Sequence, residues 1–226
     1  MKRMLSLAAI ALVSFSSFAL AAPVPYKIDP SHSEVSFRVR HFFSKTPGKF
    51  TDYAGKVLYD DKNLAASSVD VTIQAASINT NHEKRDADLR SANFFEVEKY
   101  PTLTFKSTKV VPGTDNTFKM EGDLTMHGVT EPVVLDATFL GAAPVAIGGR
   151  DMGTRAGFEA TTTINRKDFG IIWNRNLDQG GTLLGDDVQI TLAVELVPDV
   201  ATTTAADAKP AATPAKPAET KTETKK

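Results

Sequence analysis

Hydrophobic and polar positions alternate with a period of two along the middle of the chain. Val35, Phe37 and Val39, for example, are each separated by a charged or hydroxyl-bearing residue. This alternation is typical of antiparallel β-strands that bury one face and leave the other in water. It predicts strands over 34–40, 69–74, 118–126, 133–139, 158–165 and 188–196, with two weaker strands near Ala54–Tyr59 and Thr102–Val110.

Residue pairs that favour turns separate these segments. They are Pro47-Gly48, Asp60-Asp61, Pro112-Gly113, His127-Gly128 and Gly148-Gly149. One helix is expected at about Asn81–Ser91, which is rich in Glu, Lys, Arg, Asp and Ala. Thr80 or Asn81 is available as its N-cap.

About eight strands that are each apolar on one side must bring those sides together. Either a two-sheet sandwich or one sheet closed into a barrel achieves this. The aromatic residues favour the barrel, because several occur at segment ends, where a barrel mouth presents rings to an apolar guest. These are Phe42-Phe43, Phe94-Phe95, Phe158 and Phe169. A barrel of about eight strands is either filled by side chains or holds one small ligand.

The first 21 residues have the pattern of a secretory signal peptide. A basic start, Met1-Lys2-Arg3, precedes the apolar run Met4–Leu20, and Ala19-Leu20-Ala21 offers a small-residue cleavage site,. A membrane anchor is the weaker interpretation, since the run is short for the roughly 20 apolar residues of a spanning helix. We therefore expect cleavage after Ala21 and an exported, periplasmic protein without a membrane span.

Residues 200–226 consist mainly of Ala, Thr, Lys and Pro and contain no aromatic residue. Such a segment cannot bury enough apolar surface to offset its ordering entropy, so it is expected to be disordered. It is either a solvated tail without a role or a weakly basic arm that contacts anionic cell-wall polymer or lipid headgroups. Residues 22–199 are expected to form the single folded domain.

Charge and cysteine content exclude several classes of protein. The chain carries a net charge of −1, to which Lys2 with Arg3 and the tail each contribute +2, so 22–199 carries −5. Nucleic-acid binding, which needs clustered positive charge, is therefore not expected. The absence of cysteine rules out disulfides, thiolate catalysis, cysteine-ligated metals and a lipidated N-terminus,.

No constellation of residues nominates catalysis or a metal site. The four histidines, His32, His41, His82 and His127, have no metal-ligand spacing and are expected to be structural hydrogen bonders,. A meeting of His41 and His127 across the barrel stays open. The carboxylate pairs Asp60-Asp61, Asp86/Asp88 and Asp186-Asp187 are expected in turns or on the exposed helix. Neither a calcium loop nor a nucleophile elbow is present. No catalytic residue, metal or cofactor is predicted.

A series of ordered motifs resembles the YceI-like family, whose members are exported polyisoprenoid-binding proteins of lipocalin-like shape. The similarity spans about Tyr26–Val197; the tail and the loop-like stretch Gly141–Arg155 fall outside its motifs. The motifs are YKIDPSHS (26–33), VSFRVRH (35–41), GKF (48–50), YAG (53–55), SINT (77–80), DLRS (88–91), FF (94–95), YPTLTF (100–105), GDLTMHGVT (122–130) and NRKDFGI (165–171).

The resemblance implies one extended antiparallel barrel around an apolar tunnel, an isoprenoid-quinone-type or fatty-acyl guest, and a homodimer as an open alternative to a monomer. The residues proposed to line the tunnel are Phe37, Val39, Phe42, Phe50, Phe94, Phe95, Phe105, Leu124, Phe158, Phe169, Ile171 and Trp173. Those proposed to orient a headgroup are Arg38, Arg40, His41 and Arg166.

Three hypotheses for function follow. The first is a non-catalytic periplasmic lipid carrier or store. The second is an enzyme on the same scaffold that alters a bound quinone or acyl chain, and it needs polar groups that converge inside the tunnel. The third is an envelope stress or interaction protein whose guest is incidental, and it gives the tail a role.

Overall fold

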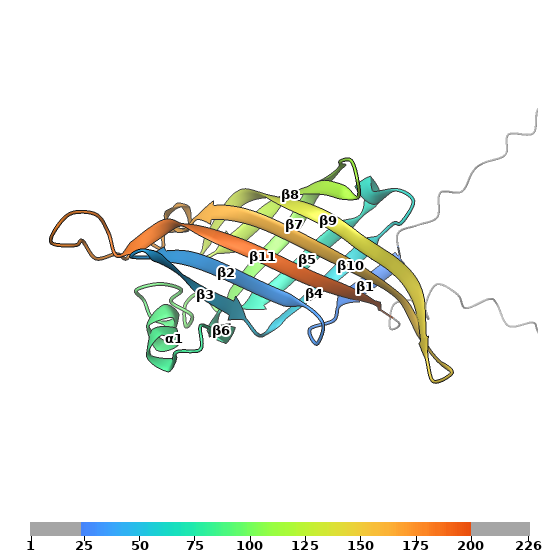
Figure 1. Cartoon of the computed structure of the whole chain (residues 1–226), viewed down its shortest axis with the longest axis horizontal. Coiled ribbons are helices and arrows are strands. Elements are labelled where there is room, and N and C mark those ends of the chain that lie inside the picture. Colours follow the sequence, from blue (N-terminus) through green and yellow to red (C-terminus); the bar gives the residue numbers. More distant parts are fainter. Residues whose placement is uncertain (1–23, 200–226) are drawn as a thin grey trace, which may run out of the picture.

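The structure is a computed structural model that describes residues 24–199. The predicted signal peptide and tail lie outside the described residues, so both stay predictions. Figure 1 shows an elongated body built almost entirely of antiparallel strands. The strands are β1 (Val24–Ile28), β2 (Glu34–His41), β3 (Ser44–Phe50), β4 (Tyr53–Tyr59), β5 (Ser68–Gln74), β6 (Ile78–Asn79), β7 (Thr102–Pro112), β8 (Thr117–Met126), β9 (Val129–Ile147), β10 (Arg150–Asn165) and β11 (Leu184–Pro198).

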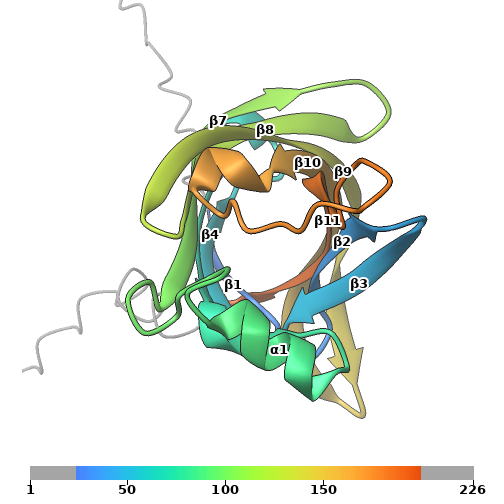
Figure 2. The same ribbon diagram turned by 90° about the vertical axis from the view of Figure 1, so that its left-hand side faces the viewer.

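Eight of these strands close into a barrel, which confirms the predicted fold class and excludes the sandwich. The order around the ring is β1-β4-β5-β7-β8-β9-β10-β11, and β1 pairs with β11 to complete it. Figure 2 looks along this ring from one end. Closure leaves the ring strands paired on both sides, which removes the exposed edges of an open sheet.

The long strand β11 has two neighbours in succession on one side. Its first part pairs with β2 through Leu184–Ala193, and its last residues pair with β1. Strand β3 pairs with β2, and β6 pairs with β3. One end of the barrel is therefore extended by β2, β3 and β6, and helix α1 (Glu83–Arg90) lies beside β6 (Figure 1).

Alternation along each strand determines which side chains enter the barrel. In the β10–β11 pair, Ala160 faces Leu192 and Ile164 faces Val188, so apolar residues of both strands share the inner face. Successive side chains point to opposite faces of a strand, so Thr161 and Thr163 are outside, whereas Thr162 shares the inner face with Ala160 and Ile164,. All six strongly alternating segments are strands, as predicted.

The predicted helix is present but begins later than expected. His82 is the N-cap, and its ring Nδ1 accepts from the backbone N–H of Arg85 at 3.3 Å. Thr80 instead donates its hydroxyl to Asp86, whose side chain is buried rather than solvated. The N-cap prediction was wrong because the tertiary contact with Asp86 engages the threonine.

The stretch Gly141–Arg155, predicted to be loop-like, is a two-stranded extension of β9 and β10. Ala142 pairs with Ala156 and Pro144 with Thr154, and the turn is at Gly148-Gly149. Figure 1 shows this hairpin projecting past one end of the barrel. It has no interior to fill, so its sequence lacks the alternation of large apolar residues that marks the other strands.

Two further local predictions were wrong. Pro47-Gly48 lies inside β3 rather than in a turn, where the missing side chain of Gly48 makes room for Phe37: a Cβ there would be 2.3 Å from Cζ of that ring. Asp186 and Asp187 lie in β11, not in a turn. In both cases pairing with a distant strand overrides the local preference.

The two ends of the barrel interior differ. A cluster of aromatic rings, Tyr26, Tyr59, Phe118, Phe139 and Phe158, packs at the end near the β9–β10 hairpin. The 3-10 helix η1 (Leu64–Ala66) contributes Leu64 to the same cluster. At the other end, α1 and the 3-10 helix η3 (Arg166–Phe169) lie near the barrel opening (Figure 2). Within 24–199, no helix is both long enough and apolar enough to cross a bilayer.

Candidate functional site: an apolar cavity inside the barrel

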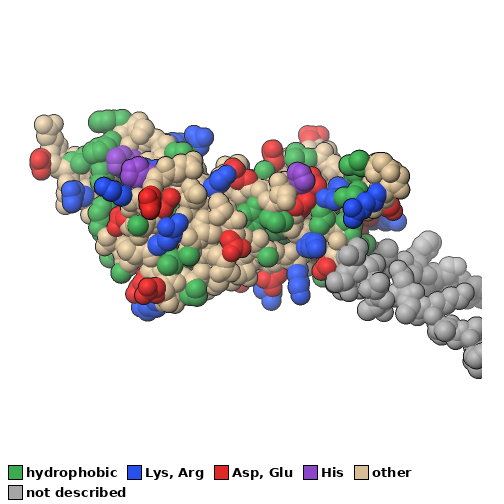
Figure 3. Space-filling view, turned by 90° about the horizontal axis from the view of Figure 1, so that it is seen from below, with side chains coloured by type: hydrophobic (Ala, Val, Ile, Leu, Met, Phe, Trp, Pro, Cys, Tyr) green, Lys and Arg blue, Asp and Glu red, His purple; other side chains and the backbone are tan. Residues whose placement is uncertain are grey.

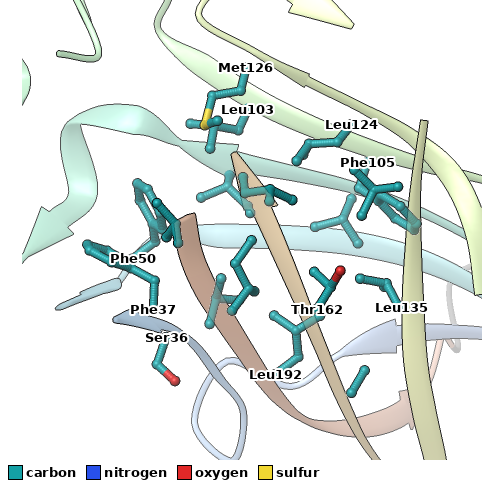
Figure 4. A pocket seen from close by; sticks show the side chains of 18 of the residues that line it. Ser36, Phe37, Phe50, Leu103, Phe105, Leu124, Met126, Leu135, Thr162 and Leu192 are labelled. Carbon is teal, nitrogen blue, oxygen red and sulfur yellow. The ribbon is translucent and has the colours of Figure 1, made fainter. Parts of the chain in front are cut away.

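The barrel interior contains a cavity of about 440 Å³. This volume falls within the range of about 300–1,000 Å³ that is typical of small-molecule sites. Its wall consists mainly of aliphatic and aromatic side chains from the ring strands and β2, and Figure 4 shows several of them converging. The space is long, because it includes residues from Leu196 and Tyr59 at the aromatic end to Trp173 and Leu184 at the other.

Ten of the twelve proposed tunnel residues lie on the cavity wall. They are Phe37, Val39, Phe50, Phe94, Phe95, Phe105, Leu124, Phe158, Ile171 and Trp173. They come from β2, β3, β7, β8, β10 and the segments after α1 and η3. Phe50 is edge-on to Phe95, with 5.8 Å between ring centroids, and Phe94 packs on Trp173 at 5.2 Å. The structure therefore brings these residues together, whereas their role in binding a lipid remains a proposal.

Two of the twelve lie elsewhere. Phe42 is at the tip of the β2–β3 hairpin, where it is 43% exposed and edge-on to His41. Phe169 ends η3 and is buried in packed core, with only 2% of its surface exposed. An aromatic residue at the end of a segment can lie on a cavity wall, at a hairpin tip or in the packed core, and sequence position does not distinguish these cases.

The four proposed headgroup residues divide in the same way. His41 and Arg166 border the cavity, whereas Arg38 and Arg40 do not. Arg38 lines a separate groove on the outer face, and Arg40 donates to the carbonyls of Phe42 and Thr182. Both arginines occupy the outward-facing positions of β2, because Phe37 and Val39 occupy the inward ones.

Arg166 has little capacity left for a ligand. Its guanidinium donates to the carbonyls of Gly185, Ile171 and Trp173 at 3.0, 2.6 and 2.9 Å, and to Asp186 Oδ1 at 3.1 Å. Four of its five N–H donors are thus used within the protein. Arg166 is best described as a clamp that joins η3, the 171–173 segment and β11 at the cavity opening.

Helix α1 and the segment before it contribute polar wall residues that the sequence analysis missed. Thr80, Arg85 and Asp88 border the cavity beside Leu89. Arg85 Nε donates to Thr80 Oγ1 at 2.7 Å, and Nη2 donates to the carbonyl of Thr80 at 2.9 Å. Neither of these hydrogen bonds uses Nη1 of the guanidinium. No sequence pattern indicates this site, since only the packing of α1 over the barrel end brings these groups to the cavity.

The missed aliphatic wall residues did leave a signal. Met120, Val188, Ile190, Leu192 and Val194 all border the cavity. Each belongs to the inward-facing set of an alternating strand that the sequence analysis identified. The sequence-based choice of tunnel residues favoured aromatic side chains, whereas inward-facing residues of every ring strand form the cavity wall.

Charged groups near the opening are fixed by neighbours. The hydrogen bond from Lys167 is the main reason that the pKa of Asp186 lies below its usual value, and Arg166 adds to the effect. Burial alone would raise the pKa of Asp86, but the hydrogen bonds from Thr80 and the charges of Arg90 and Arg85 lower it. Both carboxyls are therefore ionised at neutral pH: Asp186 pairs with Arg166 and Lys167, and Asp86 accepts from Thr80.

The aromatic end of the cavity has the opposite character. Burial raises the pKa of both Tyr26 and Tyr59, and nearby Asp61 adds to the effect. Their phenol groups stay neutral at physiological pH. The cavity therefore has an end lined mainly by aromatic and aliphatic side chains and an opposite end bordered by Arg85, Asp88 and Arg166.

The arrangement does not assemble a catalytic pair from His41 and His127. His127 is outside the cavity wall, where its Nδ1 contacts the carbonyl of Phe169 at 3.1 Å and its ring packs on Tyr100. A separate group, Asp29, His32 and Glu195, brings three ligand-type atoms within 4.8 Å of one another. Arg155 donates to both carboxylates there, at 3.4 and 3.0 Å, and offsets part of their negative charge.

The closed ring and its apolar interior place this chain in the class of small antiparallel barrels that enclose an internal cavity. The YceI-like domain profile matches residues 26–196. The chain belongs to the YceI-like family, as the motifs suggested.

Relatives of known sequence are similar over most of their length. A UPF0312 protein of Vibrio cholerae serotype O1 is 42% identical over 171 residues, which cover 75% of this chain and 88% of that protein. The protein YceI of Escherichia coli O157:H7 is 43% identical over 173 residues, covering 75% and 87%.

Solved structures share the barrel. A Campylobacter jejuni YceI protein superposes with a TM-score of 0.58 at 31% identity, covering 69% of this chain and 86% of that one. Burkholderia cenocepacia BcnA gives 0.65 at 23% identity, covering 74% and 98%. A polyisoprenoid-binding domain from Saccharophagus degradans gives 0.56 at 16% identity, covering 77% and 99%. At such low identity the last two show the fold alone.

Proposed function

We propose that this protein is an exported, periplasmic binding protein that sequesters or transports an isoprenoid or another long-chain lipid. The observation that carries the proposal is the long cavity of about 440 Å³ with an almost entirely apolar wall. Two findings support this choice of ligand. The chain belongs to the YceI-like family, and a polyisoprenoid-binding domain is among its structural neighbours. No other cofactor is part of the proposal.

Burial of the hydrocarbon chain of the lipid supplies most of the binding free energy in this proposal. Each methylene removed from water contributes roughly 0.8 kcal/mol, so a chain of about fifteen carbons gains on the order of 12 kcal/mol before costs. Ordering the chain and losing free translation offset several kcal/mol of this. One exposed ion pair adds only about 0–1 kcal/mol. The apolar wall therefore sets affinity, and the polar groups at the α1 end set orientation.

The polarity of the cavity suggests which way the lipid enters. The end with Tyr59, Phe158 and Leu196 offers aromatic and aliphatic side chains, which suit the end of a hydrocarbon chain. The end with Arg85 and Asp88 offers hydrogen-bonding groups. We place the headgroup beside α1 and the tail toward the aromatic cluster.

The test is to purify the exported protein from its own host and analyse it by native mass spectrometry and organic extraction. A long-chain lipid should be recovered in about a 1:1 ratio with the protein. A protein that is empty on isolation and also fails to take up an isoprenoid quinone in vitro would contradict the proposal. The same spectra give the oligomeric state and so decide between monomer and homodimer.

An enzyme acting on the bound lipid is the second candidate, and it is favoured only by Arg85, Asp88 and His41 at the cavity wall. Incubation of the loaded protein, followed by analysis of the extracted lipid, separates the two. An unchanged lipid supports the carrier. A converted lipid whose conversion stops in His41→Ala supports the enzyme.

A further inference from the structure

The end of the barrel that carries α1 and η3 also exposes large apolar side chains. Phe43, at the tip of the β2–β3 hairpin, is fully exposed, and Phe42 beside it is 43% exposed. Ile172, in the segment after η3, is 69% exposed. Full exposure of such side chains is unfavourable in water, so a group of them at one place marks a binding surface.

These side chains are held at the cavity opening. The backbone N–H of Phe42 donates to the carbonyl of Leu183 at 3.0 Å, and Arg40 bridges the carbonyls of Phe42 and Thr182. His41 and Leu183 both border the cavity, as do Ile171 and Trp173 on either side of Ile172. We call the two segments 38–46 and 171–183 the rim. The rim is therefore one hydrogen-bonded unit that borders the cavity at the α1 end of the barrel.

The rim is basic on an acidic protein. It contains four cationic residues, Arg38, Arg40, Lys45 and Arg175, and a single acid, Asp178, whereas 22–199 as a whole carries −5. Helix α1 nearby has three acids and three bases and does not cancel this charge. Figure 3 shows hydrophobic, cationic and histidine side chains next to one another at this end of the molecule, with some acidic side chains among them.

We propose that the rim docks the cavity opening onto an anionic phospholipid bilayer. Aromatic and aliphatic side chains enter the boundary between headgroups and acyl chains, and neighbouring Lys and Arg side chains bind the phosphates. A second copy of this chain fits less well, because a two-fold contact through the rim would bring like charges together. The inference extends the proposed function, since it assigns the surface through which a carried lipid would be exchanged.

The experiment measures flotation of the protein, exported and purified from cells that express the full chain, with large unilamellar vesicles. One set contains phosphatidylglycerol and phosphatidylethanolamine, and the other contains phosphatidylcholine alone. We expect the wild type to bind the anionic set at least about tenfold more tightly, with binding that weakens as salt is added.

Two pairs of variants locate the surface. Phe43→Ser with Ile172→Ser should reduce binding at least about tenfold, because two apolar side chains no longer enter the bilayer. The matched control is Leu140→Ser with Ile147→Ser in the β9–β10 hairpin, where Ile147 is also 69% exposed; it should change binding less than about twofold. Lys45→Glu with Arg175→Glu should abolish the preference for anionic vesicles, whereas Lys62→Glu with Arg150→Glu should retain it.

Equal loss in the rim and control pairs, or no binding of wild type to anionic vesicles, would overturn the proposal. So would a rim pair that dissociates a dimer in analytical ultracentrifugation while it leaves vesicle binding intact, because the rim would then be a contact between copies. Uptake of a quinone from dilute ethanol is measured in parallel. Failure of the wild type there refutes the carrier, whereas vesicle flotation tests the rim alone.

Discussion

At the scale of single residues, close packing inside the barrel depends on where side chains are missing. Gly122 lies within β8, opposite Ser107 of β7. A Cβ at this position would be 2.4 Å from Cζ of Phe105 and 2.6 Å from the carbonyl oxygen of Lys106. The ring can move, but the backbone oxygen belongs to a paired strand and cannot.

Gly122→Ala should therefore lower the free energy of unfolding by about 1–3 kcal/mol through overpacking. Denaturation in guanidinium chloride, read as the shift in midpoint at constant slope, measures the change. Gly157→Ala in β10 is the control, because a Cβ there makes an ordinary contact of 3.5 Å with Leu140. Equal stability of the two variants would show that β7 and β8 adjust more freely than their pairing implies.

Residue chemistry also explains why some of the predicted site residues lie away from the cavity. Arg38 and Arg40 belong to the polar set of β2, so the strand period that placed Phe37 inside the barrel necessarily placed them outside. Phe42 and Phe169 were selected for type and position at a segment end. That criterion carries no information about which end of a strand meets the cavity.

At the scale of elements, the barrel opening is built by joining short irregular segments to a strand. Arg166, only 4% exposed, connects η3 to β11 and to the carbonyls of the 171–173 segment. Lys167 next to it binds the same Asp186, but 43% of its side chain is exposed. Two neighbouring cations thus contact one carboxylate in different surroundings.

Arg166→Met should destabilise the protein by about 3–5 kcal/mol, because it leaves buried carbonyl groups without donors. Lys167→Met removes an exposed ion pair and should cost no more than about 1 kcal/mol. Hydrogen exchange should show the loss of protection in Arg166→Met concentrated at residues 171–185. An equal and small effect of both variants would mean that the clamp at the opening is dispensable.

At the scale of the whole molecule, the length of the cavity sets the length of the ligand it accepts. Ala160 of β10 borders the cavity and faces Ala137 on one side and Leu192 on the other. A large side chain here would divide the space between the α1 end and the aromatic end.

We expect Ala160→Phe to weaken binding of a long polyprenyl chain by at least about tenfold, since several methylenes lose their place and each contributes roughly 0.8 kcal/mol. Binding of a farnesyl-length chain should be unchanged. Competition for a fluorescent lipid across a series of chain lengths measures the cut-off. Ala143→Phe, on the exposed hairpin, should leave the series unchanged, and an unchanged series in Ala160→Phe would place the ligand elsewhere.

The alternation of apolar and polar residues in six segments determined the strands, their antiparallel pairing and the faces that turn inward. This follows because a strand exposes opposite faces at successive residues, so the pattern records which face is buried. The order of motifs likewise determined the family. These conclusions needed only local periodicity and residue identity.

Periodicity alone left a sandwich and a barrel open, and the tertiary structure decided that the sheet closes and that a cavity remains inside it. Closure depends on the pairing of β1 with β11, which are more than 150 residues apart, and no local signal encodes that contact. The same holds for α1, whose Arg85 and Asp88 reach the cavity only because the helix packs over the barrel end. The alternation along a strand determines whether a residue faces inward or outward. Its position along the closed barrel depends instead on the register with distant strands.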